Sequence, residues 1–122
     1  MTTTTDAQRL IAVNMSEEAL LKNILDAARK LGWRSAHFRP AKTEQGWRTP
    51  VSGDGKGFLD LVLLHERMHL VVVAECKTMK GELTKEQEGW LYSWRCAGVP
   101  ALVWRPDAWL DGTIQRVLEG HL

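Results

Sequence analysis

The hydrophobic pattern of the chain centres on one apolar run, Val71 to Ala74, which is followed directly by Glu75, Cys76 and Lys77. Such a run is typical of a central strand that is buried on both faces. Because side chains alternate along a strand, Glu75 and Lys77 point to one side and Cys76 to the other. Charges at the end of a buried strand lose their hydration, which destabilises the fold unless a partner such as a divalent cation offsets the loss.

A helical period precedes this strand. Between Ser16 and Leu31, apolar residues recur every three or four positions, namely Leu20, Leu21, Ile24, Ala28 and Leu31. Asn14 or Ser16 can cap the start of this helix. Glu17 falls in the middle of the apolar stripe and Glu18 at its margin. A capping box with Asn14 as the cap and a functional role explain Glu17 equally well.

Three strands are predicted next, over Trp33 to Arg39, Phe58 to Leu64 and His69 to Lys77, and a short turn joins the last two. These two should pair antiparallel. Asp60 lies near the start of the first and Glu75 near the end of the second, so both carboxylates meet at one end of the hairpin. An acid inside so apolar a strand has no structural reason to be there.

The segment from Ala41 to Gly57 has no periodicity and is predicted to be a loop. It contains Trp47, and basic residues lie in or beside it: Arg39, Lys42, Arg48 and Lys56. Basic residues interleaved with an aromatic residue suit a phosphate backbone and exposed bases, although an ordinary solvated loop has the same composition. Lys80, in a later loop, is a further candidate for binding DNA.

The last third of the chain predicts a helix, a strand and a final helix. Thr84 and Gln87 match a capping box that opens a helix ending near Ala97. The strand Pro100 to Trp104 should run parallel to its neighbour, because a helix connects the two. Asp111 can cap the final short helix. The predicted fold class is therefore α/β, with a mixed sheet flanked by helices.

Composition adds few constraints. The 122 residues carry a formal net charge of +1, so basic surface must come from local clustering. We expect residues 1–13 to form a frayed tail and residues 14–122 a single domain. Cys76 and Cys96 are expected to be buried thiols in a reducing compartment. No membrane-spanning or signal segment is present, so we expect a cytoplasmic protein with no membrane partner.

The sharpest chemical pattern combines Asp60, Glu75 and Lys77. The two carboxylates and the backbone carbonyl of Cys76 can ligate Mg²⁺ or Mn²⁺, which would lower the pKa of water for attack on phosphorus. Lys77 could hold that water or balance phosphate charge. The structural alternative is a strand-end ion pair between Glu75 and Lys77, with Asp60 as an acid near a turn. Gln87 could contact the same phosphate or water, serve only as a cap, or do both.

Three segments together resemble the VRR-NUC group of the PD-(D/E)XK nuclease superfamily: Gly57 to Val62, Ala74 to Lys77 and Gly81 to Gln87. Phe38 to Ala41, followed by Gly46 to Pro50, is similar to small stand-alone members encoded by bacteriophages. The resemblance covers the chain from Ser16 to Trp109. One departure is Leu59, where the family usually has proline before the aspartate.

The resemblance implies a restriction-endonuclease-like αβββαβ core and phosphodiester hydrolysis that depends on Mg²⁺ or Mn²⁺, with no organic cofactor. It implies that Asp60 and Glu75 are metal ligands and that Lys77 is the catalytic lysine. It also implies that Glu17 or Glu18 is the helix acid and that Gln87 supports the site. If the chain is phage-encoded, its compartment is the cytoplasm of a bacterial host.

The predicted function is a metal-dependent DNA endonuclease that is structure-selective for branched DNA such as Holliday junctions. Two symmetric nicks need two active sites, so we expect a homodimer. Trp90, Trp94 and Trp109 could line its interface or pack in the core. The alternatives are a catalytically silent DNA-binding module of the same fold and a nuclease that acts on linear duplex or flap DNA.

Overall fold

A computed structural model describes residues 5–38, 41–43, 46–48 and 53–122, and only the backbone of 41–43 and 46–48. In chain order the elements are α1 (Asp6–Asn14), α2 (Glu17–Lys30), β1 (Arg34–His37), β2 (Ala41–Thr43), β3 (Gly46–Arg48), β4 (Leu61–His65), β5 (Leu70–Cys76), α3 (Lys85–Cys96), β6 (Ala101–Trp104), α4 (Pro106–Leu110) and α5 (Thr113–Leu118).

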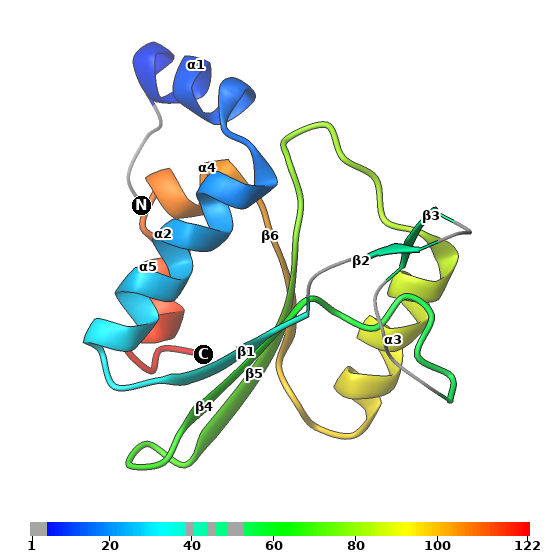
Figure 1. Ribbon diagram of the computed structural model, residues 1–122. Coiled ribbons are helices and arrows are strands. Elements are labelled where there is room, and N and C mark those ends of the chain that lie inside the picture. The colour runs from blue at the N-terminus through cyan, green and yellow to red at the C-terminus, as the bar shows by residue number, and fades with distance from the viewer. Residues whose placement is uncertain (1–4, 39–40, 44–45, 49–52) are drawn as a thin grey trace.

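The main sheet has four strands in the order β1-β4-β5-β6. The first two pairings are antiparallel, and β5 pairs with β6 in parallel. In Figure 1 this sheet lies between α3 on one side and α2, α4 and α5 on the other. The α/β class with a mixed sheet flanked by helices is thus confirmed.

The apolar core has two parts, one on each face of the sheet. The larger part joins the sheet to α2 and α5 and includes Leu20, Ile24, Leu61, Ala74, Cys76, Ile114 and Leu118. The smaller part packs under α3 and consists of Leu59, Val73, Leu91 and Ala101. The alternation along β5 therefore sends Ala74 and Cys76 toward α2 and Val73 toward α3. Glu75 shares the orientation of Val73.

The hairpin register brings the two predicted acids to the same end of the sheet. Leu61 of β4 lies opposite Ala74 of β5, so the next positions outward are Asp60 and Glu75. The two strands are slightly shorter than predicted: β4 begins at Leu61 and β5 ends at Cys76. Asp60 and Lys77 consequently lie just beyond the strand ends, at the edge of the sheet.

Ser16, rather than Asn14, caps α2, because its hydroxyl oxygen accepts a hydrogen bond from the backbone N–H of Ala19 at 3.0 Å. The side chain of Asn14 instead donates to the carbonyl of Leu10. The capping box that would have explained Glu17 is therefore absent. Glu17 is the first residue of α2, and its carboxylate still favours the positive end of the helix dipole.

Residues 5–13 do not form the frayed tail that the sequence predicts for residues 1–13, and residues 1–4 lie outside the described part of the chain. Thr5 and Gln8 form a capping box at the start of α1, and α1 contacts α4. Three apolar side chains of α1 remain exposed: Leu10, Ile11 and Val13. The prediction was wrong because the helix is short and its apolar residues do not form a buried stripe.

Two further segments differ from expectation. The predicted loop from Ala41 to Gly57 contains β2 and β3, which pair antiparallel in a separate two-stranded sheet. After β6, Pro106 opens the unpredicted helix α4. Asp111 is not the residue that caps α5, because Gly112 takes that position with a φ of 86°. The Asp111 carboxylate still accepts a hydrogen bond from the N–H of Thr113 at 2.8 Å.

The two cysteines differ in environment. Both are free thiols; Cys76 is buried and Cys96 is exposed, so the expectation of two buried thiols is wrong for Cys96. Within the described part of the chain, no helix has the length and apolar content needed to cross a membrane.

Candidate active site

A cleft of about 750 Å³ opens at the end of the sheet where Asp60 and Glu75 lie. Its walls come from α2 as far as Asp26, the end of β1, the segment before β4, the end of β5 and the start of α3. The lining residues are Glu17, Glu18, Leu21, Lys22, Leu25, Asp26, His37, Phe38, Phe58, Asp60, Glu75, Cys76, Lys77 and Gln87. Six predicted site residues thus share one cleft with Cys76.

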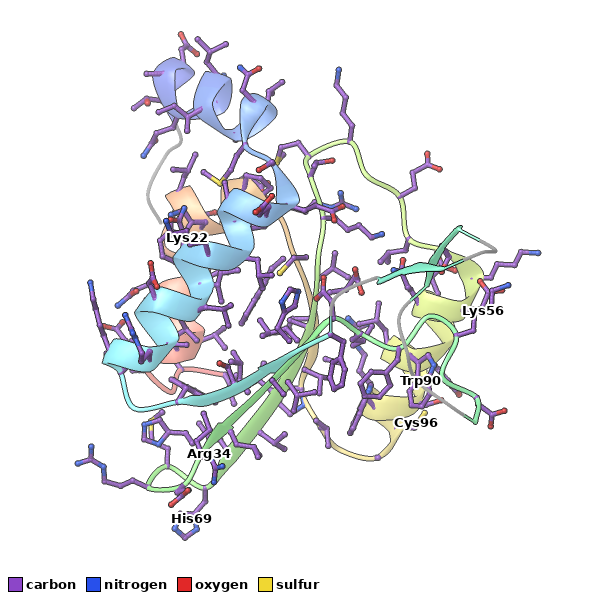
Figure 2. The ribbon with its side chains drawn as sticks, viewed as in Figure 1. Lys22, Arg34, Lys56, His69, Trp90 and Cys96 are labelled. Atoms are coloured by element: carbon purple, nitrogen blue, oxygen red, sulfur yellow. The ribbon has the colours of Figure 1, made fainter. Side chains whose placement is uncertain are left out.

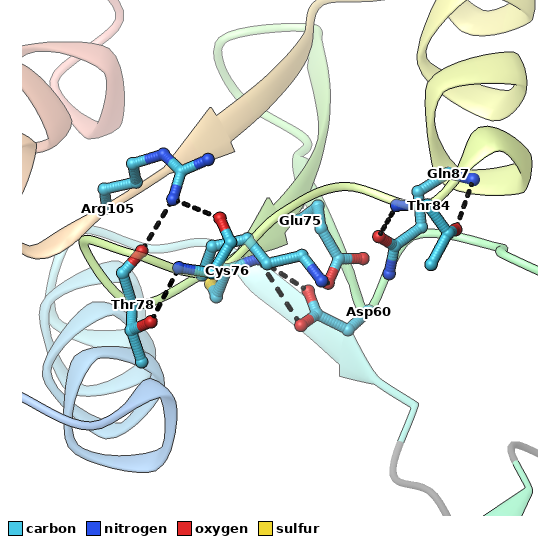
Figure 3. Close-up of polar contacts among 9 residues, drawn as sticks. Asp60, Glu75, Cys76, Thr78, Thr84, Gln87 and Arg105 are labelled. Atoms are coloured by element: carbon cyan, nitrogen blue, oxygen red, sulfur yellow. Dashed lines mark hydrogen bonds and ion pairs between the residues drawn. The ribbon is translucent and has the colours of Figure 1, made fainter.

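The backbone holds Asp60 at both ends. Its carbonyl oxygen accepts a hydrogen bond from the N–H of Phe38 at 2.9 Å. Its carboxylate accepts from the N–H of Cys76, at 3.3 Å through Oδ1 and 3.4 Å through Oδ2 (Figure 3). The second contact ties Asp60 to the residue beside Glu75. The carboxylate orientation is therefore set by the sheet rather than by a flexible loop.

Burial raises the pKa of both acids. For Asp60, burial and the charge of Glu17 raise the pKa and the hydrogen bond from the Cys76 N–H lowers it, and the resulting pKa is about 6. Burial and the neighbouring Asp60 charge bring the pKa of Glu75 to about 8, although Lys77 opposes them. At neutral pH the pair therefore keeps a proton, because a buried carboxylate and a half-buried one beside it cannot both ionise without a compensating cation.

Lys77 lies beside Glu75, as the alternation of the strand predicts. Its Nζ is 4.0 Å from Glu75 Oε2, and the two side chains are only 12% and 6% exposed. The backbone N–H of Lys77 donates to the carbonyl of Trp104 at 3.0 Å, which keeps the residue in register with β6. An ammonium group so little exposed interacts more strongly with nearby charge than a surface lysine does.

The turn after Lys77 is fastened by Arg105, a residue that the sequence did not single out. Its Nη1 donates to the carbonyls of Thr78 at 2.6 Å and Gly81 at 2.7 Å (Figure 3). Gly81 in turn donates its N–H to the Thr78 hydroxyl at 3.0 Å. A Cβ at position 81 would lie 3.5 Å from Cδ of Lys77, so the turn passes close to the lysine stem.

The structure distinguishes the two candidates for the helix acid. Glu17 and Glu18 both line the cleft and both are exposed. Of these two glutamates, only Glu17 is among the charges that raise the pKa of Asp60 and Glu75. Glu17 is therefore the carboxylate of α2 whose charge acts on Asp60 and Glu75.

Gln87 has the cap role that was predicted for it. Its N–H donates to the Thr84 hydroxyl at 3.1 Å, and its Oε1 accepts from the Thr84 N–H at 3.0 Å (Figure 3). Since the capping box uses Oε1, the amide Nε2 is the part of the side chain that can donate to a molecule in the cleft. The cap and a site contact are compatible.

The donor set suits a hard divalent cation. Mg²⁺ is commonly bound through one or two carboxylates and keeps several waters. Asp60 and Glu75 offer two carboxylates that hold a proton when no cation is near. Within the described ranges, no three His, Cys, Asp or Glu side chains are gathered closely enough to form a metal cluster. The Cys76 thiol is a poor metal ligand, because burial raises its pKa above the ordinary value and keeps it protonated. Only the backbone carbonyl of Cys76 would therefore ligate the cation.

No family model, curated protein or solved structure matches this chain. The resemblance to the VRR-NUC group therefore stays a prediction. The functional argument depends on the cleft and on the side chains that the sheet brings into it.

The predicted DNA-binding residues lie outside this cluster or outside the described side chains. Arg39 is not among the described residues, and neither are the side chains of Lys42 and Arg48. Lys56 is exposed and pairs with Glu86 at 3.4 Å, which reduces its charge toward a phosphate. Lys80 is exposed on the turn after Lys77. Lys22 of α2, which the sequence did not suggest, lines the cleft itself (labelled in Figure 2).

The three surplus tryptophans are partly buried and pack against the apolar core. Phe58 contacts the rings of Phe38, Trp90 and Trp94 at centroid distances of 5.3, 4.9 and 6.2 Å. Trp109 packs against the larger core. Of the two alternatives for the tryptophans, these contacts favour packing in the core over a dimer interface. They also place the rings of Phe38 and Phe58 in the cleft wall.

Proposed function

We propose that the protein is a metal-dependent DNA endonuclease that hydrolyses phosphodiester bonds. The observation that carries this proposal is the convergence of Asp60, Glu75 and Lys77 at one end of the sheet. Two acids with raised pKa values and a lysine in the same cleft are costly for stability and typical of a functional site.

The order of elements supports a restriction-endonuclease-like core. The helix α2 precedes the strands β1, β4 and β5, and then come α3 and the parallel strand β6. This is the αβββαβ order that the sequence resemblance implies. Strands β2 and β3 form a separate small sheet between the first and second strands of that core.

Asp60 and Glu75 would hold Mg²⁺ or Mn²⁺, with the Cys76 carbonyl as a third ligand. When bound, the cation would lower the pKa of water and stabilise charge on the phosphate. In the hydrolysis, a water oxygen bonds to phosphorus, one bridging phosphorus–oxygen bond breaks, and the leaving oxygen takes a proton. Lys77 balances the added phosphate charge or holds the water. Glu17 contributes an outer carboxylate.

Gln87 and the basic residues would position the DNA. The Gln87 amide can donate to the phosphate or to the water, because its other end is fixed in the capping box. Arg39, Lys42, Arg48, Lys56 and Lys80 are proposed to contact the phosphate backbone of the DNA. We propose branched DNA such as a Holliday junction as the substrate, cut by a homodimer, because two symmetric nicks require two copies of the site.

The test is a cleavage assay with junction, flap and linear duplex DNA in Mg²⁺ or Mn²⁺. The wild-type protein is expected to cut, and Asp60→Asn and Lys77→Ala are expected to lose activity by about 100-fold or more. Glu119→Gln and Lys30→Ala alter exposed groups that do not line the cleft and serve as matched controls. Unchanged turnover in both site variants would remove Asp60 and Lys77 from the mechanism.

The second candidate is a catalytically silent DNA-binding module of the same fold. It predicts that folded protein binds these DNAs and cuts none of them with either metal. The retained set of Asp60, Glu75 and Lys77 speaks against it, because a module that only binds DNA gains no stability from two acids with raised pKa values.

A further inference from the structure

The cleft has an apolar side as well as a charged end. Phe38 and Phe58 line it from the segments beside Asp60, and Leu21 and Leu25 line it from α2. Both phenylalanines are half-buried, so each ring keeps some exposed surface. A phosphate gains nothing from such surface, because it prefers hydrogen-bond donors and cations. The apolar side therefore suits another part of a substrate.

Phe38 is held firmly beside the candidate catalytic centre. Its N–H donates to the carbonyl of Asp60 at 2.9 Å, and its ring meets Phe58 edge to face at 5.3 Å and 86°. Phe58 is supported by Trp90, whose Nε1 donates to the carbonyls of Asp54 and Lys56 at 3.2 Å each. Figure 2 labels Trp90 and Lys56 on this side of the molecule. The Phe38 ring is thus preorganised within reach of a nucleotide bound at Asp60.

The charges of the cleft disfavour a double helix inside it. The described lining residues include two cations, Lys22 and Lys77, and a larger set of acids: Glu17, Glu18, Asp26, Asp60 and Glu75. A duplex binds through many cations along two phosphate backbones. The volume of about 750 Å³ instead matches sites of roughly 300–1,000 Å³ that enclose one small ligand.

We infer that the cleft takes a single unpaired nucleotide of a DNA strand, with its phosphate on the divalent cation that Asp60 and Glu75 would hold and its base stacked on Phe38. The inference depends on the proposed nuclease function and names its substrate class: DNA with an unpaired nucleotide at the cut, as in a flap or an opened junction. A nucleobase is the planar, weakly polar part of DNA, and aromatic side chains bind it without sequence preference.

The first test uses oligonucleotides with one 2-aminopurine, placed either in an unpaired flap or in a fully paired duplex, with Ca²⁺ in place of Mg²⁺. Stacking on Phe38 is expected to quench the fluorescence of the unpaired probe and not that of the paired one. Phe38→Leu keeps an apolar side chain but has no aromatic face, so it should bind without this quenching. Tyr92→Ala removes an exposed aromatic ring of α3 outside the cleft and should quench like the wild type.

The second measurement is affinity. Phe38→Ala is expected to weaken binding of the flap by about 5- to 150-fold and to leave binding of the paired duplex unchanged. Phe38→Trp should restore flap binding. A thermal unfolding curve for each variant shows that the protein is folded, and Phe38→Leu provides the folded comparison if the alanine variant is not.

Two outcomes separate this inference from the proposed function. If the wild type cuts DNA in an Asp60-dependent way, but Phe38→Leu quenches the probe and cuts flaps like the wild type, the stacking inference is wrong and the nuclease proposal stands. If the wild type quenches the unpaired probe through Phe38 but cuts no DNA, the nuclease proposal fails and the stacking site stands.

Discussion

Asp60 and Glu75 show how two residues can shape the pH response of a small fold. Burial raises the pKa of Asp60 from 3.8 to about 6 and that of Glu75 from 4.5 to about 8. In the unfolded chain both acids return to their ordinary values near 4. Between about pH 4 and pH 8 the folded state therefore binds more protons than the unfolded state, and the stability of the fold decreases as the pH rises through that range.

We therefore predict that the metal-free protein is more stable at pH 5 than at pH 8.5, by an amount on the order of a few kcal/mol. Glu75→Gln, which stays neutral, should flatten this dependence and exceed the wild type in stability at pH 8.5. Urea unfolding in EDTA at both pH values measures the effect. A variant with the same pH dependence as the wild type would show that Glu75 is not the group responsible.

The meeting of Asp60, Glu75 and Lys77 could be predicted from the sequence because it depends on local rules. Alternation along β5 sets Glu75 beside Lys77, and the short turn sets the register that brings Asp60 near them. Phe38 and Arg105 could not be found this way. Their contacts join segments more than twenty residues apart, and neither residue interrupts a pattern.

At the level of elements, strong periodicity was decisive. Helix α2, strand β5 and helix α3 each carry a clear apolar pattern or a capping signal and were predicted close to their observed bounds. The misses are short: α1, the pair β2 and β3, and α4. In elements this short, tertiary contacts contribute more stability than propensity does, and the sequence pattern is too brief to show them.

The turn between β5 and α3 is an element whose rigidity depends on one side chain. Arg105→Ala would leave the carbonyls of Thr78 and Gly81 without their shared donor and free the turn that passes close to Lys77. We predict a 10- to 100-fold loss, roughly, in the rate of DNA cleavage, because small displacements of a catalytic group are expensive. Cation binding should not change.

Cleavage under saturating DNA, together with a calorimetric metal titration, checks this prediction. Arg116→Ala, an exposed arginine of α5, is the matched control. If folded Arg105→Ala cleaves DNA at the wild-type rate, the turn does not position Lys77. Loss of both cation binding and cleavage would mean that Arg105 supports the whole fold rather than Lys77.

For the whole molecule, the prediction concerns assembly. A nuclease that resolves a four-way junction needs two sites. One chain has a mass of 13.8 kDa, and the protein in solution is expected to have twice that mass. Light scattering coupled to size exclusion, over a range of concentrations, measures this mass. A protein that stays monomeric with and without junction DNA would contradict symmetric resolution and favour the flap or linear-duplex alternatives.

The whole account depends on the end of one hairpin being a site for a divalent cation, and a calorimetric titration of Mn²⁺ tests this most directly. At pH 7 the wild type is expected to bind Mn²⁺ saturably and to release a proton, because the cation replaces the proton that the pair of Asp60 and Glu75 keeps at neutral pH. Asp60→Asn and Glu75→Gln should each abolish this binding, while Glu119→Gln should not alter it. Equal Mn²⁺ binding by the wild type and both site variants, or none by the folded wild type, would contradict the account.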